Sequence, residues 1–232
     1  MKVSVIIPVY NEKKTIRYII EKITKLKKIT SQIILVDDNS TDGTKEIIKK
    51  NIQSKVDTVI FKNKNCGKGA AIRTARSKIK EEIVIIQDGD LEYDPQDYFK
   101  LINPIKKGLS EVVYGSRVLN KDRYKNTNFT SKFRVFANHM LTIFSNIING
   151  QSLTDAHTCY KVFKKSRFNK LKLNENRFGF CPEVTSQLSQ QNIKIIEVPI
   201  RYKGRTFQQG KKISFKDGFR IIYVILKYKL FY

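Results

Sequence analysis

The sequence predicts an α/β fold with a mainly parallel central sheet and helices on both of its faces. Short runs rich in β-branched residues alternate with longer segments in which apolar residues recur every three or four positions. The run over residues 83–86 is wholly apolar, which is typical of a strand buried on both faces of a parallel sheet. The 232 residues are enough for one such domain with a full core.

Strands and helices are expected to alternate through the first half of the chain. A strand over residues 3–7 precedes a helix over residues 12–27, whose isoleucines fall on one face. The following elements are a strand at 33–36, a helix at 42–51, a strand at 58–61, a helix at 69–80, a strand at 83–86, a helix at 95–107 and a strand at 111–114. Parallel strands of this kind end at one edge of the sheet, where open α/β sheets bind ligands.

The second half has a less regular pattern. We expect helices over residues 130–148 and 182–191 and a strand over residues 193–200. The last segment interleaves aromatic and aliphatic residues with Lys and Arg, a pattern typical of a helix in a membrane interface or of one packed on the domain. We therefore divide the chain into a main domain, residues 1–214, and a basic aromatic C-terminal helix, residues 215–232.

The overall charge of the chain predicts an anionic partner. Lys and Arg number 45 against 21 Asp and Glu, a net charge of +24. A phosphorylated substrate, an acidic membrane or nucleic acid would fit this charge, and so would a general bias toward lysine. No nucleic-acid-binding motif occurs, which disfavours that partner. The three cysteines show no metal or disulfide spacing and indicate a reducing compartment, and no apolar run is long enough to span a membrane.

Acidic residues gather after two of the expected strands, against the overall charge. Eight of the 21 acidic residues lie in two groups: Asp37, Asp38, Asp42, Asp88, Asp90, Glu92, Asp94 and Asp97. We expect Gly89 to let the chain turn sharply, so that Asp88 and Asp90 both lie at the sheet edge. Two carboxylates suit Mg²⁺ or Mn²⁺ bridging to a diphosphate, whereas the alternative is a solvated acidic turn.

Several motifs at the expected strand ends occur in the order known from one enzyme family. They are Pro8-Val9-Tyr10-Asn11-Glu12, Val36-Asp37-Asp38-Asn39-Ser40-Thr41-Asp42-Gly43-Thr44, Asn65-Cys66-Gly67-Lys68-Gly69-Ala70, Asp88-Gly89-Asp90 and Gly115-Ser116-Arg117. The chain resembles family 2 inverting glycosyltransferases of the GT-A fold, a Rossmann-like nucleotide-binding fold. It is most similar to the branch that contains dolichol-phosphate mannose synthase and polyprenyl-phosphate glycosyltransferases.

This resemblance implies the transfer of a sugar from GDP-mannose or a UDP-sugar to a polyprenyl phosphate, dolichyl or undecaprenyl, with a divalent metal as cofactor. By the same resemblance, Asp88 and Asp90 hold Mg²⁺ or Mn²⁺. The implied nucleotide-sugar contacts are Pro8, Tyr10, Glu12, Val36, Asp38, Lys68, Asp88, Gly89, Asp90, Glu92, Arg117, Arg205 and Lys211. The implied catalytic residues are Asp90, Asp155, Arg117, Arg205 and Lys211.

The expected roles of these residues follow from the charge that develops on the leaving diphosphate. Arg117, Arg205 and Lys211 would stabilise that charge, although a solvated basic segment is the alternative for the last two. A lipid phosphate is already an anionic nucleophile, whereas a hydroxyl needs a base. Asp155 would be that base or would orient the acceptor, and its alternative role is a cap or salt bridge.

Two departures from the family pattern leave the donor open. Glu92 stands where relatives that make mannosyl-phospho-dolichol carry glutamine, and Gly89 stands where alanine is usual. The acceptor also has an alternative, a glycan or protein hydroxyl. A nucleotidyltransferase is disfavoured because no glycine-rich loop follows the first strand. We expect a cytoplasmic protein that binds the anionic cytoplasmic face of a membrane peripherally, without nucleic acid as a partner.

Overall fold

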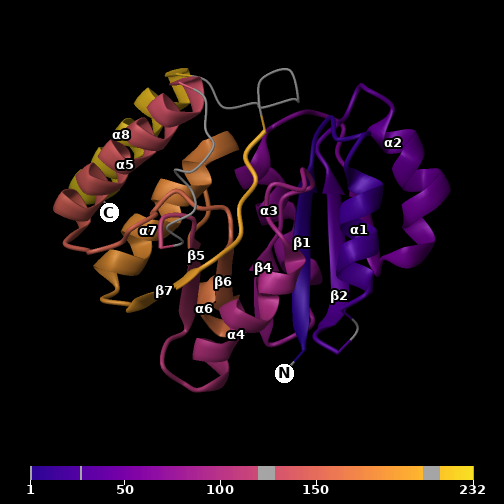
Figure 1. Ribbon diagram of the computed structural model, residues 1–232, viewed down its shortest axis with the longest axis horizontal. Helices are drawn as coiled ribbons and strands as arrows, with labels where there is room; N and C mark the ends of the chain where they lie inside the picture. The colour runs from indigo at the N-terminus through magenta and orange to yellow at the C-terminus, as the bar shows by residue number, and fades with distance from the viewer. Residues whose placement is uncertain (1, 27, 120–128, 206–214, 232) are drawn as a thin grey trace.

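The computed structural model describes residues 2–26, 28–119, 129–205 and 215–231, which form one sheet with helices on both faces (Figure 1). The strands lie in the order β3-β2-β1-β4-β6-β5-β7. Their bounds are β1 (Val3–Val9), β2 (Thr30–Asp37), β3 (Thr58–Phe61), β4 (Ile83–Ile86), β5 (Val112–Ser116), β6 (Lys161–Lys164) and β7 (Ile195–Pro199). The prediction of a mainly parallel sheet is confirmed, since β6 alone among these strands runs antiparallel to its neighbours.

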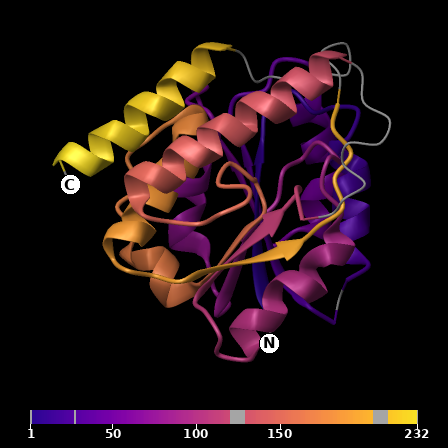
Figure 2. The same cartoon turned by 60° about the vertical axis from the view of Figure 1, so that its left-hand side comes forward.

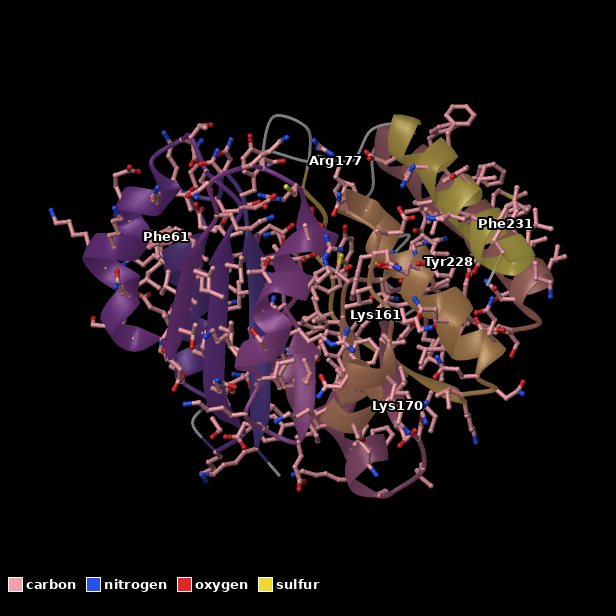
Figure 3. All side chains as sticks on the ribbon, turned by 180° about the vertical axis from the view of Figure 1, so that it is seen from behind. Phe61, Lys161, Lys170, Arg177, Tyr228 and Phe231 are labelled. Carbon is pink, nitrogen blue, oxygen red and sulfur yellow. The ribbon has the colours of Figure 1, made fainter. Side chains whose placement is uncertain are left out.

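Strand β6 was not predicted, because it has only four residues and begins and ends with lysine. The side chain of Lys161 is nevertheless fully buried near the middle of the protein (Figure 3). Its ammonium group donates to the carbonyl oxygen of Ala156 at 2.9 Å and lies 3.5 Å from the ring centroid of Tyr114. Burial lowers the pKa of Lys161 to about 8. A charged residue inside a strand conceals the apolar pattern that sequence reasoning relies on.

The helices largely follow the predicted order. They are α1 (Ile16–Thr24), α2 (Thr44–Ile47), α3 (Lys68–Ala75), α4 (Tyr98–Lys106), α5 (Phe129–Asn149), α6 (Lys165–Lys170), α7 (Phe180–Gln190) and α8 (Phe215–Phe231). Helix α6 was not predicted. Helix α1 begins four residues later than predicted, because residues 12–15 form a turn in which the amide of Ile16 donates to the carbonyl of Glu12 at 3.0 Å. A π-helical turn, Ile48–Ile52, extends α2.

Two apolar cores lie on opposite faces of the sheet. Val5 and Ile7 of β1 pack into the core that contains α1 and α4. Ile6 between them belongs to the other core, together with α3 and α7. This alternation follows from the two-residue period of a strand, whose side chains point to either face in turn. The wholly apolar β4 contributes to both cores, as a central strand of a parallel sheet should.

Helix α8 runs beside α5 and is fixed to the domain by its inner side (Figures 1 and 2). The hydroxyl of Tyr228 donates to Glu183 Oε1 at 2.5 Å, and Figure 3 shows this tyrosine toward the body of the protein. Arg220 and Lys227 pair with the two carboxylate oxygens of Glu175 at 2.5 and 3.0 Å. Among the described residues, no helix is long and apolar enough to cross a bilayer.

Candidate active site at the carboxyl edge of the sheet

The loops after β1 and β2 form one continuous surface at the carboxyl edge of the sheet. The amide of Asn11 donates to Ser40 Oγ at 2.9 Å, and the amide of Thr41 returns a bond to Asn11 Oδ1 at 2.8 Å. The amide of Glu12 donates to Thr44 Oγ1 at 2.8 Å. Strands β1 and β2 are adjacent and place Pro8 opposite Val36, with Tyr10 and Asp38 following them. The structure therefore brings the first two predicted nucleotide-binding segments together.

Asp38 holds the turn that precedes α3. Its Oδ2 accepts from the amides of Cys66, at 3.0 Å, and of Gly67, while Lys62 Nζ bonds its Oδ1 at 2.5 Å. Gly67 has a left-handed backbone, φ 85°, and a Cβ there would lie 2.5 Å from the Cγ of Arg177. A glycine is required at this position for both reasons. The family resemblance implies that Asp38 contacts the nucleotide sugar, and the structure gives its carboxylate these internal partners.

The turn at Gly67 delivers Lys68 to the first aspartate of the acidic pair. Lys68 is the first residue of α3, and its Nζ bonds Asp88 Oδ1. Burial alone would lower the pKa of Lys68, but the Asp88 carboxylate outweighs burial and raises that pKa above its ordinary value. A lysine in this ion pair remains positively charged at neutral pH, beside the carboxylate that is predicted to bind a metal ion.

The second aspartate of the pair, Asp90, lies against Arg205. Its Oδ2 accepts from Arg205 Nη2 at 3.0 Å, and its Oδ1 accepts from the amide of Glu92 at 3.1 Å. Burial raises the pKa of Asp90 to about 7, with the neighbouring carboxylates of Asp88 and Glu92 adding to the effect and Arg205 opposing it. Arg205 also pairs with both oxygens of Glu12, at 2.8 and 3.1 Å.

The chain turns at Gly89 and Asp90, directly after β4. We predicted that Gly89 would let the chain turn sharply, and the left-handed residue lies just after the aspartate pair. The left-handed residue is Leu91, with φ 62°, whereas Gly89 is not left-handed. A Cβ at Gly89 would meet Val9 Cγ2 at 3.5 Å, an ordinary contact, so the site has room for an alanine.

A second group of functional side chains lies beyond β4, around Arg117 at the end of β5. Asp155 Oδ2 accepts from Arg117 Nε at 2.7 Å and from its amide at 3.0 Å, and Asp155 Oδ1 accepts from Arg117 Nη2 at 2.7 Å. Asn138 of α5 bonds the same Oδ1 at 3.2 Å. The side chain of Asp155 is wholly buried and that of Arg117 nearly so. The two predicted catalytic residues thus form a forked ion pair.

Two residues that sequence reasoning missed connect and support these groups. Glu197 of β7 accepts from the amides of Thr154 and Asp155 at 2.7 and 2.9 Å, and its position as the lone carboxylate of an apolar strand was an available signal. The hydroxyl of Tyr202 donates to Glu92 at 2.8 Å, while the guanidinium of Arg117 lies 5.2 Å from its ring centroid. Tyr202 therefore bridges the two halves of the site.

The residues at the end of β4 fit a hard divalent ion. Asp88 and Asp90 supply carboxylate oxygens, the ligands that Mg²⁺ and Mn²⁺ prefer. Within the described part of the chain, no three His, Cys, Asp or Glu side chains are grouped to hold a metal by themselves. Mg²⁺ is usually held by one or two carboxylates together with substrate phosphates, and the Asp88–Asp90 pair matches this arrangement. Lys211, the remaining predicted phosphate contact, lies outside the described residues.

Comparison with known proteins identifies the family. The family model described as "Glycosyl transferase family 2" matches residues 4–172 of this chain. The chain belongs to this family. It is a glycosyltransferase with the GT-A fold, which confirms the family, the fold and the enzyme class predicted from the sequence.

The chain is similar over nearly its whole length to enzymes named for polyprenyl phosphates. It is 29% identical to a UDP-N-acetylglucosamine–dolichyl-phosphate N-acetylglucosaminyltransferase of Methanococcus voltae, covering 98% of this chain and 96% of the relative. It is 27% identical to a dolichol-phosphate mannosyltransferase of Pyrococcus furiosus, covering 99% of this chain and 65% of the relative. Relatives of this branch are sugar transferases named for lipid phosphates.

The fold is also shared with solved structures. Glucosyl-3-phosphoglycerate synthase of Mycobacterium tuberculosis, in a complex with Mg²⁺ and UDP, superposes with a TM-score of 0.71 at 16% identity. That match covers 98% of this chain and 79% of the synthase. A further complex of the synthase contains Mn²⁺, UDP and phosphoglyceric acid and has a TM-score of 0.70. At this identity the likeness establishes the fold alone.

Proposed function

We propose that this glycosyltransferase moves a sugar, with inversion, from a nucleoside-diphosphate sugar to a polyprenyl phosphate, with Mg²⁺ or Mn²⁺ held by Asp88 and Asp90. The observation that carries the proposal is the meeting of these two carboxylates with Lys68 and Arg205 at the carboxyl edge of β4. Carboxylates for a metal ion and fixed cations for phosphate oxygens are what a diphosphate leaving group requires.

On the donor side, each charged residue has a separate task. A bound divalent ion would supply Lewis-acid stabilisation of the leaving diphosphate. Lys68 and Arg205 would add fixed positive charge, which is most effective where water is excluded. Their side chains are only 13% and 15% exposed. Lys211 would add a further cation, as the family resemblance implies.

The family resemblance assigns Arg117 to the leaving diphosphate, but we propose that it contacts the lipid phosphate of the acceptor instead. Its forked pairing with Asp155 fixes the guanidinium at the end of β5, and the ring of Tyr202 packs against it. A phosphate oxygen would attack the anomeric carbon from the side opposite the departing diphosphate, and this single displacement inverts the configuration. Both carboxylate oxygens of Asp155 bond Arg117, which favours a role in positioning that arginine. A general base is not needed, because a phosphate nucleophile is already an anion.

A test should offer the enzyme both kinds of acceptor. Labelled UDP-N-acetylglucosamine, UDP-glucose and GDP-mannose are each incubated with vesicles containing either a polyprenyl phosphate or the corresponding polyprenol, with Mg²⁺, Mn²⁺ or EDTA. We expect transfer from one donor to the phosphate only, and none in EDTA. Transfer to the alcohol or to a soluble glycan would support the alternative hydroxyl acceptor instead, and undiminished transfer in EDTA would refute the metal.

A lipid acceptor requires contact with a membrane, and we propose that α5 and α8 supply it at the anionic cytoplasmic face. The two helices lie side by side (Figure 2). Both expose large apolar side chains. Those more than half exposed are Phe136, Ile147, Phe219, Tyr223, Leu230 and Phe231. Such a face fits the headgroup–acyl boundary of a bilayer.

The basic side chains of α8 are only partly available to contact lipid. The sequence left open whether this helix lies in a membrane interface or packs on the domain, and Arg220 and Lys227 both bond Glu175 of the domain. Lys229 is exposed, and the net charge of +24 remains available for long-range attraction. We therefore attribute the proposed membrane binding mainly to apolar burial and only partly to specific charge contacts.

A further inference from the structure

Arg205 is surrounded by three carboxylates that come from two different strand ends. Its Nη1 and Nη2 bond the two oxygens of Glu12, which follows β1, at 2.8 and 3.1 Å. The same Nη2 bonds Asp90 Oδ2 at 3.0 Å, and Nε lies 3.6 Å from Glu92 Oε1. One guanidinium group thus holds together three acidic side chains of the donor site.

This arrangement places a cation of the protein against a proposed ligand of the metal ion. Asp90 is one of the two carboxylates proposed to hold the ion, and its Oδ2 faces the guanidinium. A divalent ion that approaches this oxygen meets the positive charge of Arg205. The side chains of Glu12, Asp90 and Arg205 are 7%, 15% and 15% exposed, so solvent screens this repulsion weakly.

Glu92 also holds the segment that carries Arg205. Its Oε1 accepts from the backbone amide of Arg205 at 2.9 Å, and its Oε2 accepts from Tyr202 at 2.8 Å. The carboxylate here provides both a negative charge for the guanidinium and an anchor for the segment that carries it.

We propose that Arg205 takes the place of the divalent ion in the donor-free enzyme, so that the ion and Arg205 compete for Asp90. When the donor binds, its diphosphate oxygens would accept hydrogen bonds from the Arg205 guanidinium. The Asp90 carboxylate would then be available to bind the ion. The metal ion therefore binds weakly alone and strongly together with the nucleotide. This inference rests on the proposed function, and it adds that the metal ion and the nucleotide bind together rather than the ion first.

The test measures Mn²⁺ binding rather than sugar transfer. Free Mn²⁺ is titrated by electron paramagnetic resonance against the wild-type protein, Arg205→Ala and Arg205→Gln, without nucleotide and then with saturating UDP or GDP. Without nucleotide, both variants should bind Mn²⁺ about tenfold more tightly, the equivalent of one charge-assisted hydrogen bond. With nucleotide, the variants should lose this advantage, because the diphosphate then lacks its arginine.

Lys203→Ala is the matched control, because Lys203 is exposed, lies two residues before Arg205 and carries the same charge. Its Mn²⁺ affinity should stay within about twofold of the wild type, because exposed charges are well screened. Melting curves of every variant report whether the fold is retained. An equal effect of Arg205→Ala and Lys203→Ala, or no effect of either Arg205 variant, overturns the inference. Failure of Mn²⁺ to bind the wild type with either nucleotide would instead refute the metal in the proposed function.

Discussion

Replacing Asp155 by asparagine should destabilise the protein severely, although the two side chains have nearly the same shape. The carboxylate accepts three bonds from Arg117, at 2.7, 2.7 and 3.0 Å, and the pair is almost completely buried. An amide keeps one acceptor oxygen but removes the charge, which leaves a guanidinium without its counter-ion in the interior. Breaking a buried ion pair from one side costs about 3–5 kcal/mol.

The assay is urea denaturation of Asp155→Asn together with its melting curve. For a chain of this size each kcal/mol shifts the melting temperature by about 2–4 °C, so a fall of roughly 6–20 °C is expected. Asn138→Ala is the control, since it removes two hydrogen bonds to the same pair but leaves the ion pair intact, and it should cost less, about 1.5–3 kcal/mol. The double variant Arg117→Gln/Asp155→Asn should regain part of the loss, because no lone charge remains.

The same measurement separates the two roles first considered for Asp155. A general base could be replaced with little loss of stability, and its removal would eliminate one limb of the pH–rate profile. A residue that positions Arg117 should instead lower stability and acceptor affinity together. A melting temperature of Asp155→Asn within 1 °C or so of the wild type would refute our reasoning about the buried pair.

Three further outcomes are expected. Asp90→Asn should keep the wild-type melting temperature yet reduce sugar transfer by at least about a hundredfold, because a charged ligand of the proposed metal is lost; transfer at the wild-type rate would exclude this role. Phe136→Ser combined with Leu230→Ser should weaken sedimentation with anionic vesicles, whereas Phe99→Ser, an exposed phenylalanine on α4, should not; equal effects would argue against the α5–α8 face. The third outcome concerns acid stability. Burial opposes the ionisation of Glu175, but its bonds to the two α8 cations lower its pKa below the ordinary 4.5. Its stabilising contribution is therefore present above about pH 4.5 and lost as the pH falls through the lowered pKa. Denaturation curves of Glu175→Gln should lack this acid-dependent part, and an unchanged pH dependence would contradict it.

Much of the fold could be predicted because its strands are short, apolar and separated by helical patterns. Strands β3 and β4 have the bounds expected from the sequence, since turn residues flank both runs. The acidic groups after β2 and β4 were placed correctly at one edge, because parallel strands send their carboxyl ends the same way. Local pattern and chain direction were sufficient for these features.

The contacts that organise the site could not be predicted in the same way. Glu12 and Arg205 are 193 positions apart, and no local pattern pairs them. The antiparallel insertion of β6 between β4 and β5 depends on the burial of Lys161, a residue type that sequence reasoning places at the surface. The left-handed conformation of Leu91, with φ 62°, could not be predicted either, because leucine is not a residue type that favours it.

Helix α8 has two apolar sides, and its inner side is packed against the rest of the domain. Tyr228 is bonded to Glu183, and Val224 and Ile225 are buried, before anything contacts the outer side. Many surface-seeking helices are disordered in water and lose conformational entropy when they fold on a partner. A helix that the domain has already ordered avoids that loss, so the apolar area covered by a surface on its outer side does not have to offset the cost of folding the helix.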